Sequence, residues 1–230
     1  MYLVEFFLAA LISVAAGIDR TAGPQIMLSR PLVVAPLTGL ALGDPLAGLQ
    51  VGVLLELLWL CRVPAGSAIP PDDTQIGVGA TFLSIVFAKV LNADPLAVML
   101  FAVLVSCLAG RVGVFFDRRA RQGNGRGIAR IQQAVREGIL EETEGVHLLG
   151  LLYFALSSLA TFLVIVLVGA VCLWWFFPLL EKLLLMGGGY LKTAFPLVGA
   201  VAILGTLRIR YTVTLFLASF TSTLLLLWYF

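Results

Sequence analysis

From Leu151 to Leu180 the sequence contains no charged residue. About 20 apolar residues in a helix cross the hydrocarbon core of a bilayer, so a run of this length predicts a membrane segment. In lipid every backbone N–H and C=O must find a partner within the protein, which leaves helices and closed β-barrels as spanning structures. A barrel would show short segments of alternating polarity. The continuous apolar runs therefore predict an all-α integral membrane protein.

The composition of the whole chain supports this prediction. Of its 230 residues, 60% are hydrophobic and 12% are charged, and the mean hydropathy is +1.04. Soluble domains carry about 25% charged residues, so a soluble chain of this kind would lack polar surface to cover its core. The three cysteines lie in or beside separate apolar runs without metal-ligand spacing, which indicates structural thiols.

We expect a single membrane domain over residues 1–230, a multi-span helical bundle with short broken or re-entrant helices. Two apolar pieces, Pro31–Gly43 and Leu46–Cys61, are short and contain glycine or proline; such segments often mark substrate sites in transporters. The first run carries Glu5 instead of a basic leader, so we expect an uncleaved helix. The candidate spans are Tyr2–Ile18, Gly77–Leu91, Pro95–Phe116, Leu148–Leu185 (too long for one span, and expected to continue in or re-enter the membrane after Pro178), Tyr190–Leu207 and Tyr211–Phe230.

The segment 117–147 is the obvious non-membrane part of the chain. It is preceded and filled by basic residues between Arg111 and Arg136, so the positive-inside rule predicts a cytoplasmic loop. Gly123-Asn124-Gly125 predicts a turn, and Ile128–Leu140 is compatible with a helix. The loop is either a solvated connection or a docking surface for a soluble partner.

Glu56 is an ionisable residue in an otherwise apolar segment, with no opposite charge within four residues. Placing an ionisable side chain in lipid costs free energy, so its presence there suggests a functional role. Trp59 lies three residues on, on the same helical face. A carboxylate beside an aromatic ring can hold a sugar. The alternative for Glu56 is a structural ion pair with Arg62 or with another helix, and the alternative for Trp59 is an aromatic anchor at the membrane interface.

The segment 64–75 is the second candidate site. Pro70-Pro71 excludes a regular helix there, and small residues including Gly66 and Ser67 precede it. A helix starting near Asp72 would have an N-cap. The segment is either a turn with a cap or an unwound substrate loop whose Asp72, Asp73 and Gln75 reach hydroxyl groups.

Charged residues also flank the first break in the pattern. Asp19, Arg20 and Arg30 could form an ion pair, snorkel to the interface, or belong to a gate. Asp44 and Asp94 each precede a proline and predict helix starts. No catalytic set, metal cluster or cofactor motif is recognisable, and the lone His147 fits an interfacial residue better than a catalytic one. We therefore expect a non-enzymatic protein without catalytic residues, metal or cofactor.

An ordered set of short motifs carries a family resemblance. Arg30-Pro31-Leu32, Leu42-Gly43-Asp44, Leu55-Glu56-Leu57 and Pro70-Pro71-Asp72 occur in this order between residues 15 and 90. The chain resembles the membrane permease subunit IIC of the mannose/fructose/sorbose family of the bacterial phosphotransferase system (PTS).

The resemblance implies a hexose or hexosamine permease subunit in the bacterial inner membrane. It implies a second membrane subunit, IID, soluble phosphocarriers IIA and IIB with HPr and enzyme I upstream, an oligomeric assembly, and an elevator-like shift of a core domain. It also implies that Glu56 and Asp72 contact the sugar. Pro64 and Cys61 depart from the family pattern in the segment expected to hold it.

Two alternatives remain compatible with the residues. One is a stand-alone ion-coupled secondary transporter with Glu56 as the coupling carboxylate. The other is a non-transporting sensor or regulatory IIC homologue, which we expect if the short C-terminus leaves the chain unable to transport.

Overall fold

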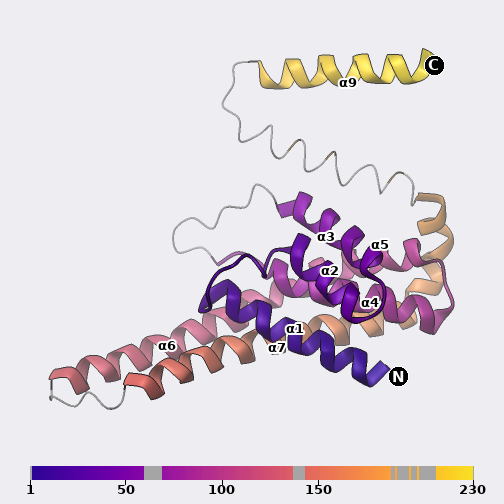
Figure 1. Ribbon diagram of the computed structural model, residues 1–230. Helices are drawn as coiled ribbons and strands as arrows, with labels where there is room; N and C mark the ends of the chain where they lie inside the picture. The colour runs from indigo at the N-terminus through magenta and orange to yellow at the C-terminus, as the bar shows by residue number, and fades with distance from the viewer. Residues whose placement is uncertain are drawn as a thin grey trace.

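The computed structural model describes residues 2–59, 69–136, 143–187 and 211–229, together with residues 190, 197 and 201. Within these residues the protein is helical and contains no strand (Figure 1). A further helical segment occupies 177–187. The elements are α1 (Tyr2–Thr21), α2 (Pro31–Ala41), α3 (Pro45–Trp59), α4 (Asp73–Leu91), α5 (Pro95–Ala109), the short 3₁₀ helix η1 (Gly110–Val112), α6 (Gly113–Arg136), α7 (Thr143–Trp175) and α9 (Thr212–Tyr229).

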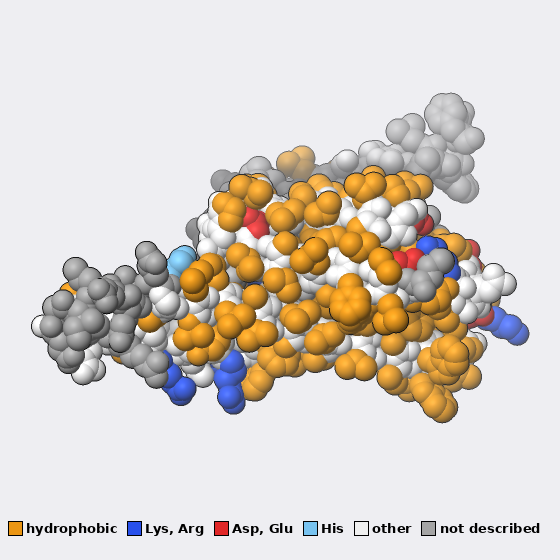
Figure 2. Space-filling view, turned by 60° about the horizontal axis from the view of Figure 1, so that its bottom comes forward, with side chains coloured by type: hydrophobic (Ala, Val, Ile, Leu, Met, Phe, Trp, Pro, Cys, Tyr) orange, Lys and Arg blue, Asp and Glu red, His pale blue; other side chains and the backbone are white. Residues whose placement is uncertain are grey.

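Four helical stretches of the described chain are long and apolar enough to cross a membrane: α1, α4, the continuous α5–η1–α6 stretch to Gln133, and α7 from Gly145. Helices α2 and α3 are apolar but shorter. The face seen in Figure 2 is covered largely by apolar side chains, and Lys and Arg side chains project at its edges. Large exposed leucines and phenylalanines of this kind suit a surface that faces lipid.

Helix α4 lies at the centre of the bundle, in contact with α1, α2, α3, α5 and α7. Every residue of α4 from Thr74 to Val86 is buried. Phe82 packs edge-on against Phe6 of α1 and Phe162 of α7, with ring centroids 5.9 and 6.2 Å away. The start of α4 is therefore surrounded by protein, which is where an intramembrane polar group can be tolerated.

The two predicted short apolar pieces form a tight helical hairpin, α2–α3. Pro31 occupies the first turn of α2, where its missing N–H costs nothing. A Cβ on Gly48 would collide with the Ala35 carbonyl oxygen, and one on Gly52 would lie 2.8 Å from the Pro31 carbonyl oxygen. The prediction of short helices is confirmed, and these glycines serve close backbone packing more than chain breaking.

The turn predicted at Gly123-Asn124-Gly125 is wrong, because α6 continues as a helix through all three residues. The physical reason is packing between α6 and α7, which run side by side (Figure 1). A Cβ on Gly123 would lie 3.0 Å from Cε2 of Tyr153, so the glycine admits an aromatic ring against the helix. Its small size, not its backbone freedom, is what the fold uses.

Helices α1 and α4 and the α5–η1–α6 stretch occupy the first three predicted spans with shifted bounds. The long run divides at a turn on Phe176, and the helical segment 177–187 begins just before Pro178. The last predicted span corresponds to α9. Most of the predicted Tyr190–Leu207 span lies outside the described residues.

Candidate functional site

The site is organised by the start of α4. Pro70 and Pro71 lie in an irregular segment, and Asp72 is the N-cap, whose Oδ1 accepts a hydrogen bond of 3.1 Å from the Gln75 backbone N–H. The first N–H groups of a helix have no intrahelical partner, so a capping carboxylate satisfies one of them. The predicted helix start at Asp72 is confirmed.

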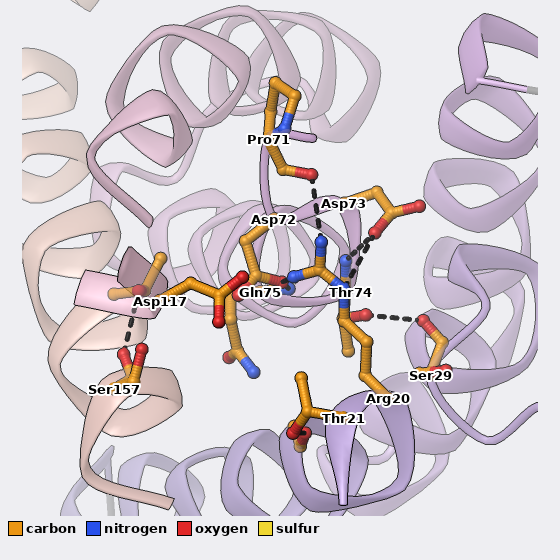
Figure 3. A network of polar contacts seen from close by, with 12 residues as sticks. Arg20, Thr21, Ser29, Pro71, Asp72, Asp73, Thr74, Gln75, Asp117 and Ser157 are labelled. Carbon is orange, nitrogen blue, oxygen red and sulfur yellow. Dashed lines mark hydrogen bonds and ion pairs between the residues drawn. The ribbon is translucent and has the colours of Figure 1, made fainter. Parts of the chain in front are cut away.

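Arg20, from the end of α1, holds this start in place (Figure 3). Its Nη1 lies 2.7 Å from Asp72 Oδ1, and its Nε lies 3.8 Å from Asp73 Oδ1. Its Nη2 donates to the Pro71 carbonyl oxygen at 3.4 Å. The Arg20 and Asp72 side chains are 17% and 8% exposed, so this is a largely buried ion pair that joins α1 to α4.

Asp19 has a different role from its neighbour. Its carboxylate accepts the backbone N–H groups of Ile26 at 2.9 Å and Ser29 at 3.2 Å. The Ser29 carbonyl oxygen in turn accepts a 2.7 Å hydrogen bond from the Thr74 hydroxyl. Asp19 therefore orders the connection between α1 and α2, and this connection is fastened to the first turn of α4.

Glu56 of α3 pairs with the arginine that precedes α2. Its Oε1 lies 3.6 Å from Nη1 of Arg30, and its Oε2 accepts the Leu32 backbone N–H at 3.2 Å. Arg30 directly follows Ser29, whose carbonyl oxygen accepts the hydrogen bond from Thr74 in the first turn of α4. Two sets of ion pairs thus lie near the start of α4: Glu56 with Arg30, and Arg20 with Asp72 and Asp73.

Trp59 ends α3 and lines a groove of about 630 Å³ together with Pro71, Cys107 and Arg111. The groove places the aromatic ring beside the segment that leads into α4. Gly66 and Ser67, also predicted for the site, lie outside the described residues, as do Pro64, Cys61 and Arg62.

Gln75 lies one turn deeper and is fully buried. The Ser13 hydroxyl donates to Gln75 Oε1 at 2.6 Å, and Gln75 Nε2 donates to the Ser13 carbonyl oxygen at 2.9 Å. Ser13 was not predicted, because a serine in an apolar helix resembles any small packing residue. Asp44 stands apart from this cluster as a cap of α3, accepting the Ala47 N–H at 3.0 Å.

Asp117 of α6 is a second residue that the sequence did not reveal. Its side chain is 8% exposed and accepts two hydrogen bonds from Arg121, one turn later, at 3.1 and 3.3 Å. It also interacts electrostatically with Arg20. An aspartate followed four residues later by an arginine, directly after Phe115-Phe116, was the available signal.

The cluster brings carboxylates, guanidinium groups and an aromatic ring together inside an apolar bundle. Such groups can exchange hydrogen bonds with a hydroxyl-rich solute. This polar cluster and the membrane-length helices together define a helical membrane protein with the features of a transporter.

Comparison with known proteins gives the family. The sequence pattern described as the PTS system sorbose-specific IIC component matches residues 3–228, and the chain belongs to this family. The putative N-acetylgalactosamine permease IIC component 2 of Escherichia coli (strain K12) is 40% identical over 70 residues, covering 30% of this chain and 52% of that protein. The chain thus matches about half the length of this relative. The fructose permease IIC component of Bacillus subtilis (strain 168) is 26% identical over 220 residues, covering 93% and 74%.

Solved structures share the fold. One titled "Structure of membrane protein" superposes with a TM-score of 0.69 at 20% identity, covering 95% of this chain and 85% of that one. A chain of the mannose transporter ManYZ in complex with microcin E492 superposes with a TM-score of 0.56 at 18% identity, covering 96% and 85%. The predicted fold class and family resemblance are confirmed.

Proposed function

We propose that this chain is the sugar-translocating IIC subunit of a phosphoenolpyruvate-dependent phosphotransferase system. It binds a hexose or hexosamine within the membrane and delivers it for phosphorylation by partner subunits. The observation that carries the proposal is the pair of ion pairs near the start of α4, Glu56 with Arg30 and Asp72 with Arg20, in a chain of a PTS IIC family.

The names of the relatives support the substrate class. They are described as permeases or PTS components for N-acetylgalactosamine, fructose, sorbose and mannose, all of which are sugars or amino sugars. Stereochemical choice among them depends on a few hydroxyl contacts. Glu56, Trp59 and the segment that carries Gly66 and Ser67 are the residues we assign to those contacts.

The same proposed site includes Asp72, Asp73 and Gln75, which have a structural role as well as a role in sugar binding. Each already has protein partners: Asp72 and Asp73 bind Arg20, and Gln75 binds Ser13. We propose that they shape the sugar segment and supply their remaining acceptor positions to hydroxyl groups. Asp19, Arg20 and Arg30 then act as the frame that holds the segment.

The partners follow from the same proposal. A membrane subunit IID completes the assembly, which is an oligomer, and soluble IIA and IIB subunits carry the phosphoryl group from HPr and enzyme I. One neighbouring structure is of the ManYZ transporter, in keeping with a two-component membrane assembly. The arginines of α6 support our proposal that its end of the bundle lies on the cytoplasmic side of the bacterial inner membrane.

The test is uptake of radiolabelled mannose, fructose, sorbose and N-acetylgalactosamine by cells that express the chain with its partner subunits. A hydrogen bond to a charged group contributes about 1.5–3 kcal/mol, so Glu56→Gln should lower uptake of the transported sugar by about 10- to 150-fold. Membrane insertion should be unchanged, as measured by the amount of protein in the membrane fraction.

Glu181→Gln is the matched control, since Glu181 lies in the helical segment 177–187 and forms no ion pair with Arg20 or Arg30 among the described residues. It should transport as the unmodified chain does. Full uptake by the Glu56→Gln variant, at a normal amount of protein in the membrane, would show that Glu56 does not contribute to sugar transport.

A further inference from the structure

A groove of about 430 Å³ runs between α6 and α7. Because the two helices are antiparallel, Phe116, Leu156 and Ala160 line one end of the groove. Arg126 and Tyr153 line the other. The groove therefore has an apolar end toward the start of α6 and a basic end farther along α6.

The basic end is built by one face of α6. Arg119, Gly123 and Arg126 are spaced by four and three residues, which places them on the same side of the helix. At Gly123 the missing side chain leaves room for the Tyr153 ring, since a Cβ there would lie 3.0 Å from Cε2 of the ring. The glycine thus brings a phenol of α7 between two arginines of α6.

Both arginines, Arg119 and Arg126, are exposed on α6. Among the described residues, no acidic side chain forms an ion pair with Arg119 or Arg126. The nearby carboxylate of Asp117 is engaged by Arg121, at 3.1 Å. The Arg119 guanidinium lies 5.0 Å from the centre of the Phe115 ring, a contact that leaves its hydrogen-bond donors available. The groove therefore carries two exposed positive charges with no counter-ion from these residues.

We propose that this groove binds an anionic phospholipid. Its headgroup phosphate is held by Arg119 and Arg126, and an acyl chain lies along Phe116 and Leu156. The stretch from α5 into α6 and helix α7 both belong to the membrane-length helices, and the Leu156 side chain is 52% exposed, so the apolar end opens where lipid tails run. A soluble anion would match the arginines but leave that end empty. Basic pockets between membrane helices are suited to anionic headgroups.

The test is native mass spectrometry of the detergent-purified full chain titrated with phosphatidylglycerol or phosphatidylcholine. An arginine near an anionic surface contributes roughly a factor of five in affinity, so Arg119→Gln/Arg126→Gln should bind phosphatidylglycerol about 30-fold more weakly. The charge-conserving pair Arg119→Lys/Arg126→Lys should retain most of the binding. The unmodified chain should prefer phosphatidylglycerol over phosphatidylcholine, a comparison that needs no variant.

Arg118→Gln/Arg136→Gln is the matched control, because it removes the same charge from another face of α6 and should bind normally. Equal loss in this control would show a general surface-charge effect and overturn the site. Equal binding of the two lipids by the unmodified chain would also overturn it. Displacement of the lipid by millimolar inorganic phosphate would identify a free-anion site instead, and unchanged binding by the glutamine pair would exclude the two arginines.

Discussion

Replacing Arg20 with glutamine removes the cation that Asp72 meets at 2.7 Å and Asp73 at 3.8 Å. The carboxylate of Asp72 then remains largely buried without that charge partner. Removing one member of a buried ion pair costs about 3–5 kcal/mol. Because the Arg20 side chain is still 17% exposed, water can screen part of the remaining charge, and we expect the lower end, about 3 kcal/mol of unfolding free energy.

The reverse change, Asp72→Asn, should cost less. Asparagine keeps an oxygen for the Gln75 backbone N–H and is as good an N-cap as aspartate. Arg20 also retains Asp73. In the double variant no uncompensated Asp72 charge remains, so about 1–2 kcal/mol of the summed losses should be recovered, within the range measured for coupled neighbours.

The assay is equilibrium unfolding in detergent, followed by tryptophan fluorescence, for the four proteins of this double-mutant cycle. Arg118→Gln is the control, since Arg118 is exposed on α6 and forms no ion pair among the described residues. Losses for Arg20→Gln and Asp72→Asn that add within about 0.5 kcal/mol would refute the coupling on which the site geometry depends.

Three packing and hydrogen-bond changes can be measured in the same way. Gly17→Val places a side chain where Ser158 lies and should cost about 1–3 kcal/mol, with partial recovery in Gly17→Val/Ser158→Gly. Ser13→Ala leaves the buried Gln75 amide without its 2.6 Å donor and should cost about 1–3 kcal/mol, whereas no loss would show that the pair is not formed. Gly48→Ala drives a methyl group into the backbone of α2 and should destabilise the hairpin by about 1–3 kcal/mol, and an unaffected protein would contradict the close approach of α2 and α3.

The local part of the site could be predicted from the sequence. Asp72 after two prolines indicates an N-cap, and Glu56 in an apolar segment requires an interior partner; both follow from chemistry within a few residues. The partners could not be predicted. Arg20 meets Asp72 across 52 positions only because α1 and α4 pack together, and Arg30 meets Glu56 through the α2–α3 hairpin.

The glycines show why the structural role of a residue could be predicted only in part from the sequence. At Gly43, with φ of +82°, the residue makes the turn between α2 and α3 that the break in the pattern indicated. At Gly123 the same residue type lies inside a helix and makes room for Tyr153. A glycine can be required for its backbone freedom or for its small size, and the sequence is the same in both cases. Only the residues that pack against the glycine show which property the fold uses.

The transport that we propose for this chain is coupled to phosphorylation of the sugar. Its most direct test is the chemical form of labelled sugar taken up by membrane vesicles that contain this chain and a IID subunit. We predict that sugar phosphate accumulates only when phosphoenolpyruvate, enzyme I, HPr and the IIA and IIB subunits are supplied inside. Accumulation of unmodified sugar driven by a proton gradient, without those proteins, would contradict the account and identify an ion-coupled carrier.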